Sequence, residues 1–263
     1  KGKIVIGEGE LDEAPMLYIG EKVGTTNGPE IDIAVDPLEG TNFAANNLPG
    51  ALSVIAIAGK NNLFHAPETY MEKISAKVNE KGVVDLDYST RENIFNLCEY
   101  LNKKPESITA CVMDRPRHKD IIDELNILGV KIKLITDGDV SGALLVTDDK
   151  YGVDIFLGIG GGPEGVLASA ALDTFECSFQ GRFLFHTEED KRRANKMGIT
   201  NLSKKYELDE IVKGDSIFCA TGVTSGDLVS GIRTENNKFI TETLVTHKST
   251  GLKKIIKKVE NRY

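Results

Sequence analysis

Short apolar runs alternate with polar loops along most of this chain. In the first third, apolar runs at 3–6, 31–35 and 51–58 are bounded by Gly, Pro, Asn or Asp, which is typical of buried strands. A turn at 59–62 follows the third run, and we expect residues 63–66 to resume the sheet. The first third is therefore predicted to be strands with polar loops at their ends.

The middle of the chain alternates helices with strands. A capping box at 89–92 opens a predicted helix that runs to about Asn102. Strands predicted at 108–113, 130–135 and 153–157 are each followed by a polar loop and a helix. Such repeated units favour parallel strands joined by right-handed crossovers, with ligands at the carboxyl ends of the strands.

The last third carries fewer signals. Its pattern predicts a polar helix with a solvated face, a second short helix, and three strands, in the order 187–196, 208–212, 216–221, 239–246 and 252–259. Lysines alternate with apolar residues in the last of these segments, which indicates a half-exposed strand or helix. No repeat or linker is visible. We predict two packed halves, residues 1–85 and residues 86–263.

Composition and charge narrow the possible functions. The chain has 263 residues, 40% of them hydrophobic, and a net charge of −8, so nucleic acid is an unfavourable partner. No apolar run approaches the length of a membrane span, and we expect no membrane partner. The four cysteines are far apart and lack C-x-x-C spacing, which is typical of free thiols in a reducing compartment. The sequence therefore predicts a cytoplasmic protein.

The clearest chemical signal follows the second apolar run, in the segment Asp36-Pro37-Leu38-Glu39-Gly40-Thr41. We expect Pro37 to end the strand pairing, because it has no N–H to donate. Gly40 allows a tight turn, which places two carboxylates and a hydroxyl close together. Carboxylate oxygens are the ligands that Mg²⁺ and Mn²⁺ prefer. A turn whose acids are simply solvated is the alternative, and this motif alone does not exclude it.

A second acidic segment, residues 7–16, follows the first apolar run. It contains Glu8, Glu10, Asp12 and Glu13 within six residues, and their mutual repulsion must be offset by water or by a cation. The glycines on either side of Glu8 permit close backbone approach at a strand end. An exposed acidic loop is the alternative interpretation.

Two further loops suggest anion binding. Positive charge at a helix N-terminus is unfavourable, so the basic cluster Arg115, Arg117, His118 and Lys119 favours an anionic partner over a solvated helix start. The glycine-rich segment 158–165 is expected to form a loop whose free N–H groups face a phosphate. Glu164 within that loop requires a metal ion between its carboxylate and the anion. A glycine-rich loop by itself is weak evidence.

These segments together resemble the class II fructose-1,6-bisphosphatases, which belong to the lithium-sensitive, metal-dependent sugar and inositol phosphatases. The residues that carry the resemblance run in order across nearly the whole chain: 5–10, 12–21, 32–41, Ala66-Pro67 with Tyr70-Met71, 115–118, 137–140, 158–161 with 163–165, and 220–224. The segment from Asp36 to Thr41 points to the superfamily, whereas the acidic segment and the glycine-rich segment near Glu164 point to class II. The sequence departs little from the family pattern, except in Asn42-Phe43.

The resemblance implies an α/β fold, a layered α-β-α-β-α sugar phosphatase sandwich, whose second half we expect to contain a mostly parallel sheet. It implies hydrolysis of the 1-phosphate of fructose 1,6-bisphosphate to fructose 6-phosphate and phosphate, a gluconeogenic step, through two metal ions that activate water. It also implies Mn²⁺ or Mg²⁺ as the cofactor, a small sugar bisphosphate as the ligand, and a homo-oligomer, either a dimer or a tetramer.

The resemblance assigns the metal-binding loops to residues 1–85, and it assigns the substrate loops, which complete the metal site, to residues 86–263. It assigns site residues as well. It gives Glu8, Asp36, Glu39 and Glu164 as metal ligands, and it gives Thr41, together with Asp12, a role in positioning or deprotonating the attacking water. The residues implied to hold the sugar bisphosphate are Glu39, Gly40, Thr41, Tyr70, Arg115, Pro116, Arg117, Asp137, Gly138, Asp139 and Gly161. From the sequence alone, Tyr70 and its neighbour Lys73 are expected at the surface.

Three alternatives remain open at this stage. The first is a related enzyme with dual activity that also hydrolyses sedoheptulose 1,7-bisphosphate. One more carbon in the sugar changes the distance between the two phosphates but not the chemistry of the reaction. An inositol monophosphatase shares the Asp36–Thr41 chemistry but needs no arginine pair for a second phosphate. A non-catalytic sugar-phosphate sensor is disfavoured by the intact carboxylates and Thr41. We also expect residues upstream of Lys1, beginning with a helix, to supply a further Asp to the metal site.

Overall fold

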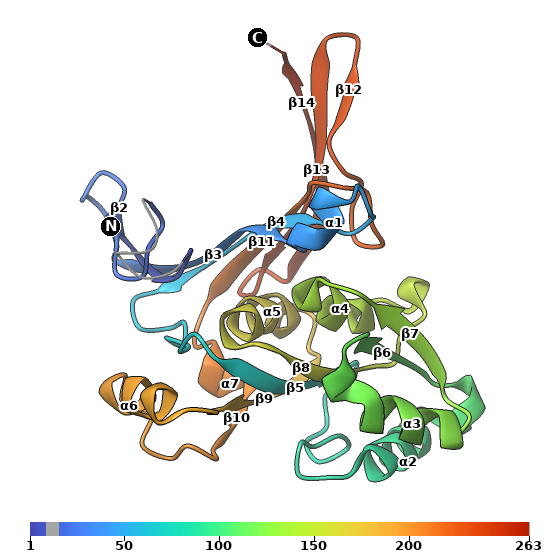
Figure 1. The fold of residues 1–263 in the computed structure, drawn as a ribbon. Helices are drawn as coiled ribbons and strands as arrows, with labels where there is room; N and C mark the ends of the chain where they lie inside the picture. Colours follow the sequence, from blue (N-terminus) through green and yellow to red (C-terminus); the bar gives the residue numbers. More distant parts are fainter. Residues whose placement is uncertain (9–15, 263) are drawn as a thin grey trace.

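Two mixed β-sheets form the framework of the chain in this computed structural model, which describes residues 1–8 and 16–262 (Figure 1). The first sheet has the strand order β12-β13-β11-β4-β3-β1-β2, and β14 pairs along β13. Only β1 and β3 pair in parallel within it. Its strands are β1 (Gly2–Ile6), β2 (Lys22–Val23), β3 (Ile31–Glu39), β4 (Leu52–Gly59), β11 (Ser216–Gly222), β12 (Arg233–Glu235), β13 (Lys238–His247) and β14 (Leu252–Asn261).

The second sheet has the strand order β10-β9-β5-β8-β6-β7. The three strands predicted to be parallel are confirmed, because β6 pairs in parallel with both β7 and β8. The expectation of a mostly parallel sheet is too broad, since β5, β9 and β10 pair only antiparallel. The strands are β5 (Tyr70–Ala76), β6 (Thr109–Met113), β7 (Lys131–Ile135), β8 (Ile155–Gly161), β9 (Ser178–Leu184) and β10 (Lys205–Glu207).

Helices fill the space between the sheets and cover the outer face of the second sheet (Figure 1). The described residues thus stack sheet, helices, sheet and helices, which is consistent with the predicted α/β sandwich. Between the sheets lie α4 (Asp139–Leu144) and α5 (Gly162–Thr174), and on the outer face lie α2 (Thr90–Leu101) and α3 (Lys119–Ile127). The remaining helices are α1 (Thr41–Ala45), α6 (Glu188–Lys196), α7 (Leu208–Ile211) and four 3₁₀ turns at Pro105–Ser107, Pro116–His118, Leu145–Thr147 and Asp149–Tyr151.

The local helix signals are confirmed in detail for α2. Ser89 Oγ accepts the Glu92 N–H at 3.2 Å, and Glu92 Oε2 accepts the Ser89 N–H at 2.8 Å, so the capping box closes in both directions. The helix ends at Leu101, and Asn102 follows with a left-handed φ of 51°.

The segment 63–66 is different from the prediction. Leu63 makes only an isolated bridge to Val212 and no strand forms there.

The boundary expected near residue 85 does not separate the two sheets. β5 precedes that position and yet belongs to the second sheet, whereas β11 to β14 follow it and complete the first sheet. The chain therefore crosses between the sheets more than once. Each sheet depends on segments far apart in sequence, and the site between the sheets draws on both halves.

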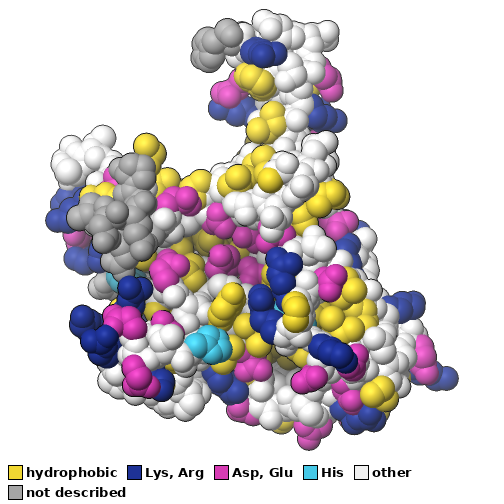
Figure 2. Space-filling view, in the orientation of Figure 1, with side chains coloured by type: hydrophobic (Ala, Val, Ile, Leu, Met, Phe, Trp, Pro, Cys, Tyr) yellow, Lys and Arg dark blue, Asp and Glu magenta, His cyan; other side chains and the backbone are white. Residues whose placement is uncertain are grey.

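The strands β12, β13 and β14 form an arm that projects from the body of the molecule (Figure 1, Figure 2). All ten residues of β14 are exposed, although a half-exposed segment was expected. The exposed fractions are 40% for Leu252, 42% for Ile255, 44% for Ile256 and 52% for Val259. This arm is thus an apolar and basic surface with little covering from the rest of the chain.

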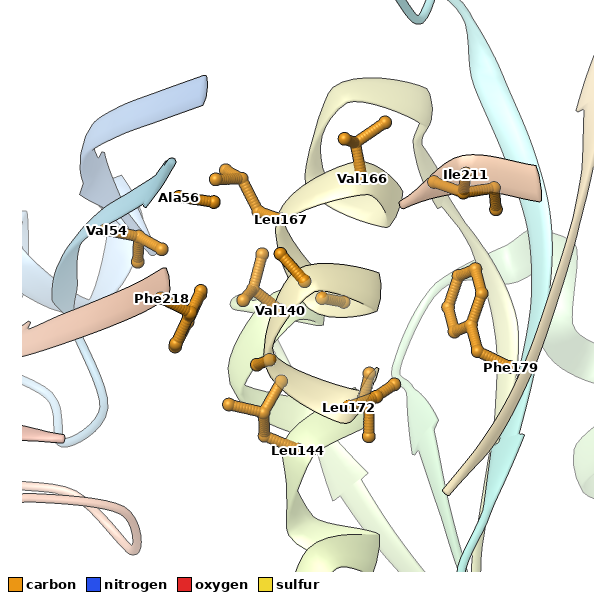
Figure 3. Close-up of a cluster of buried hydrophobic side chains, with 14 of the residues drawn as sticks. Val54, Ala56, Val140, Leu144, Val166, Leu167, Leu172, Phe179, Ile211 and Phe218 are labelled. Atoms are coloured by element: carbon orange, nitrogen blue, oxygen red, sulfur yellow. The ribbon is translucent and has the colours of Figure 1, made fainter. Parts of the chain in front are cut away.

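The main hydrophobic core lies between the sheets and is centred on α5 (Figure 3). Leu167 of α5 faces Ala56 and Phe218 of the first sheet, and the other side of this core meets Phe179 of the second sheet. Because α5 is apolar around its whole circumference, both sheets can pack on it. A second core, which includes Ile74, lies between the second sheet and helices α2 and α3.

Candidate active site

A β-bulge brings Asp36 and Glu39 to the same place at the end of β3. In a regular strand, residues three apart point to opposite faces of the sheet. Asp36 pairs with Val54 and Glu39 pairs with Leu52, so three steps along β3 match two along β4. Pro37 lies inside this irregularity, where its missing N–H costs little. The strand therefore continues through Glu39 and does not end at Pro37 as the sequence suggested.

Glu164 joins these two side chains from the first turn of α5. One oxygen each from Asp36, Glu39 and Glu164 lie within 4.8 Å of one another. Glu39 is buried, and its Oε1 accepts the Val140 N–H at 2.9 Å. The buried Oε2 of Glu164 has no hydrogen-bond partner among the described residues. Three carboxylates thus converge, and one of their oxygens is left without a donor.

Burial and mutual repulsion raise the pKa values of all three carboxyl groups. Desolvation is the largest cause in each case, and the charge of Asp139 adds to it. The pKa of Glu164 rises to about 7, and the pKa of Glu39 rises well above its ordinary value. A cation among these groups would remove the repulsion and favour their ionised forms.

The glycine-rich segment 158–165 forms the end of β8 and the first turn of α5, and not the loop that the sequence suggested. Gly158 to Gly161 pair with β5, which offers an antiparallel partner that local sequence signals did not reveal. Carboxylates lie directly against this strand. A Cβ at position 160 would lie 1.7 Å from Asp139 Oδ2, and one at position 161 would lie 1.8 Å from Glu164 Oε2. The glycines therefore make room for acidic side chains.

Asp139 is held by Lys73, a lysine that was expected at the surface. Lys73 is only 1% exposed, and its Nζ lies 2.5 Å from Asp139 Oδ2. Because β5 lies in the middle of the second sheet, its alternating side chains point into packed layers. Lys73 lies two residues from Met71 and two from Ser75, so all three side chains point to the same face of β5. This spacing is the signal that could have predicted a buried lysine.

Phe43 joins the loop after β3 to the loop after β7. Gly40 and Gly138 both have φ of 77°, which glycine adopts without strain. A Cβ at Gly40 would lie 2.8 Å from the Phe43 ring, and one at Gly138 would lie 3.0 Å from it. Asp137 Oδ2 also accepts the Asn42 N–H at 3.1 Å. The structure thus brings two of the predicted substrate loops together.

Arg115 and Arg117 lie at the edge of the same region. Arg115 Nη2 is 3.9 Å from Asp137 Oδ1, and Arg117 donates from Nε and Nη2 to Ile159 O at 3.0 and 2.8 Å. The Arg117 guanidinium lies over the Tyr70 ring, with Cζ 4.9 Å from the ring centre. Figure 2 shows acidic side chains gathered in the hollow between the sheets, with basic side chains beside it.

The rest of the predicted basic cluster has other partners. His118 is fully buried; its Nδ1 lies 2.7 Å from Met113 O, and its Nε2 accepts the Ile159 N–H at 2.8 Å. This arrangement requires a neutral ring with the proton on Nδ1, in agreement with a pKa lowered mainly by burial. Lys119 pairs with Asp123 on α3. His118 is therefore a structural link between β6 and β8.

Glu8 lies on the wall of an acidic cleft of about 400 Å³, together with Asp36, Glu164 and Arg193. It is exposed and is not part of the three-carboxylate cluster. Thr41 is exposed at the first position of α1, two residues after Glu39. The other candidate for handling the attacking water, Asp12, falls outside the described residues.

The remaining predicted ligand positions lie close by in the fold. Tyr70 is opposite Gly161 in the pairing of β5 with β8. Pro116 is exposed at the start of the 3₁₀ turn that precedes α3. A larger hollow of about 650 Å³ has mainly apolar walls, including Leu48 and Leu134. The smaller, acidic cleft is therefore the candidate active site.

The donor set of this cleft fits a hard divalent cation. Its cluster offers only carboxylate oxygens, which suit Mg²⁺, Mn²⁺ or Ca²⁺ better than softer metals. The buried, unpartnered oxygen of Glu164 is a position at which such an ion supplies the missing interaction. Arg115 and Arg117, at the edge of the same region, are of the residue type best suited to binding a phosphate.

None of the helices in the described part of the chain has the length and apolar character needed to cross a membrane.

Comparisons with known proteins give matches over most of the chain. Residues 1–260 match the family described as "Bacterial fructose-1,6-bisphosphatase, glpX-encoded". The chain is 43% identical over 259 residues to the D-fructose 1,6-bisphosphatase class 2/sedoheptulose 1,7-bisphosphatase of Prochlorococcus marinus (strain MIT 9301). It is 42% identical over 270 residues to the protein of the same name from Synechococcus sp. (strain JA-3-3Ab). Both matches cover 93% of this chain and 78% of the relative. The chain therefore belongs to the bacterial, glpX-encoded fructose-1,6-bisphosphatase family, a family of metal-dependent phosphatases.

Proposed function

We propose that the protein hydrolyses the 1-phosphate of fructose 1,6-bisphosphate, which yields fructose 6-phosphate and phosphate. Membership of the family supports the reaction. The observation that carries the proposal is the convergence of Asp36, Glu39 and Glu164 in a cleft near two arginines. An inositol monophosphatase has less need of such an arginine pair, because its substrate carries a single phosphate.

The proposed metal ligands are Asp36, Glu39 and Glu164, with Glu8 on the wall of the same cleft. Mn²⁺ or Mg²⁺ is the proposed cofactor, because both prefer carboxylate oxygens. When bound, such ions offset the negative charge of the phosphate and lower the pKa of bound water. The backbone N–H of Val140 fixes Glu39, and Gly161 leaves space for Glu164, so both carboxylates are oriented by the fold.

Thr41 is proposed to position the attacking water through its hydroxyl, because it is exposed directly after the turn at Gly40. The water oxygen bonds to phosphorus, and the bond between phosphorus and the C1 oxygen of the sugar breaks. The departing sugar oxygen takes a proton, which restores the hydroxyl of fructose 6-phosphate. Asp12 stays a prediction, from the resemblance alone, as a group that assists in removing the proton from water.

Arg115, Arg117 and Tyr70 are proposed to hold the second phosphate of the substrate. Arg117 is kept in place by Ile159 O and by the Tyr70 ring, so little side-chain freedom is lost on binding. The sugar is proposed to lie against the two joined loops, at Gly40 and Thr41 and at Asp137 to Asp139, with Pro116 and Gly161 nearby. The names of the relatives favour sedoheptulose 1,7-bisphosphate as a second substrate.

We also propose that the protein works in the cytoplasm as a homo-oligomer. All four cysteines are free, as is usual in a reducing compartment. Residues 233–262, the arm, contain eight Lys or Arg and three Glu, a net charge of +5, which leaves −13 for the rest of a chain whose total is −8. A second copy thus offers an acidic body to this basic and apolar arm. Pairing between two β14 edges is less favourable, because both carry four lysines.

Asp36→Asn is expected to lower kcat by at least about 10²-fold, since even the loss of an outer partner of a bound metal costs about 10- to 100-fold. The change removes a negative charge and preserves shape. Phosphate release from fructose 1,6-bisphosphate with Mn²⁺ or Mg²⁺, before and after EDTA, measures it. Asp149→Asn, at an exposed surface site, is the control. Undiminished, EDTA-resistant release by Asp36→Asn would exclude the proposed mechanism.

Arg115→Ala is expected to raise KM for fructose 1,6-bisphosphate by about tenfold or more, because a hydrogen bond to a charged group contributes roughly 1.5–3 kcal/mol. Fructose 1-phosphate lacks the second phosphate, so its KM should change little. Steady-state kinetics with both substrates test this, with Arg91→Ala on α2 as the matched control. Equal losses on both substrates would mean that Arg115 does not recognise the second phosphate.

The metal-free protein is expected to lose stability as pH rises through 7. The pKa of Glu164 moves from 4.5 to about 7 on folding, so the folded protein holds a proton that the unfolded chain releases between those values. The free energy of unfolding therefore falls with rising pH in this window. Thermal unfolding in EDTA at pH 5.5 and pH 8 should show the decline, and Glu164→Gln should flatten it. A Glu164→Gln protein with the same slope would contradict this assignment.

Ile256→Asp in the arm is expected to shift the oligomer toward monomer, since it places a charge in the proposed contact. The monomer should keep its melting temperature, because Ile256 is exposed there. Sedimentation velocity and light scattering measure the mass, and Ile127→Asp, at an exposed site on α3, is the control. A monomeric wild type, or an unchanged mass for Ile256→Asp, would remove the arm from the interface.

A further inference from the structure

Lys73 is a buried cation beside the acidic cleft that the proposed reaction does not use. Its side chain is 1% exposed, and its Nζ contacts Asp139 Oδ2 at 2.5 Å. Asp139 itself is 6% exposed. Removing both charges from water carries a large desolvation cost, which their attraction offsets only in part. A pair of apolar residues would serve the core at least as well, so stability alone does not explain this pair.

The surrounding backbone is shaped to admit the pair. A Cβ at Gly160 would lie 3.2 Å from Lys73 Nζ as well as 1.7 Å from Asp139 Oδ2. A Cβ at Gly165 would lie 3.4 Å from Lys73 Cε. Two glycines from β8 and α5 thus line the path of the lysine toward the carboxylate. The contact is a specific feature of the packing between the sheet and the helices.

The charge of Asp139 acts on the acidic cluster, although Asp139 is not one of its three converging carboxylates. Its charge raises the pKa of both Glu39 and Glu164, whereas Lys73 acts to lower the pKa of Glu164. The three carboxylates whose oxygens come within 4.8 Å of one another do not include Asp139. The next residue, Val140, donates its N–H to Glu39 Oε1. The anchoring of Asp139 therefore also fixes the helix start that orients Glu39.

We propose that Lys73 is a positioning residue that serves as a fixed counter-ion of the acidic cleft. Its ammonium group engages Asp139, keeps this fourth carboxylate away from divalent cations, and so limits how tightly the cleft binds them. This inference rests on the proposed metal dependence of the protein. The fold thereby contributes one permanent positive charge, and Asp36, Glu39 and Glu164 remain for exchangeable ions.

Two single changes should have opposite effects on metal binding. Lys73→Met keeps the unbranched shape of the side chain, one atom shorter, but removes its charge, which leaves four carboxylates without the lysine counter-ion. We expect Mn²⁺ to bind at least about tenfold more tightly, or with one additional equivalent, because the local potential becomes more negative. Asp139→Asn leaves the ammonium unpaired, and we expect Mn²⁺ to bind at least about tenfold more weakly. The double variant should lie within about threefold of wild type, since the net charge is restored.

Calorimetric titration of Mn²⁺ into the EDTA-stripped full chain, for wild type and the three variants, tests the proposal. Near-UV circular dichroism establishes which variants are folded. A folded Lys73→Met protein with wild-type affinity and stoichiometry would overturn the proposal and make the pair purely structural. If Lys73→Met does not fold, Asp139→Asn and the double variant decide, and wild-type affinity in Asp139→Asn overturns the proposal. Phosphate release by the wild type, measured in parallel, tests the proposed function separately.

Discussion

Like charges that are confined in a poorly hydrated pocket repel one another, and the rest of the site depends on how this repulsion is balanced. Asp36, Glu39, Asp139 and Glu164 lie together between the two sheets, and burial raises the cost of ionising Asp36, Glu39 and Glu164. The fold offsets part of this cost with the Val140 N–H and the Lys73 ammonium. The N-terminus of α5, where Glu164 lies, contributes a favourable dipole. The repulsion that is left over would favour the binding of a cation.

The same balance explains how an acidic protein of this family can accept a doubly phosphorylated sugar. With a net charge of −8, the chain as a whole repels such an anion. Positive charge is instead concentrated at the edge of this region, on Arg115 and Arg117, and cations at the proposed carboxylate ligands would extend it inward. Because Arg117 is fixed by Ile159 O and by Tyr70, this charge is presented in one orientation.

Local signals in the sequence predicted the features of the fold and of the candidate site that lie within single segments. The capping box of α2, the three parallel strands and the acidic segment ending at Thr41 were all identifiable from their own residues. Features that depend on distant partners were not. The bulge at Pro37 requires pairing with β4, and the strand character of 158–161 requires β5. Lys73 was placed at the surface because nothing near it in sequence indicates the carboxylate of Asp139.

The close approach of carboxylates to β8 has a consequence for how this site can change during evolution. At positions 160 and 161, any side chain larger than hydrogen would overlap Asp139 or Glu164. A replacement there requires the facing carboxylate to move or to be shortened, and either change would disturb the proposed cation site. Substitutions at these positions are therefore coupled to the acids that face them, and the order in which they arise matters. This short piece of backbone and the acids that face it can diverge only as a linked set.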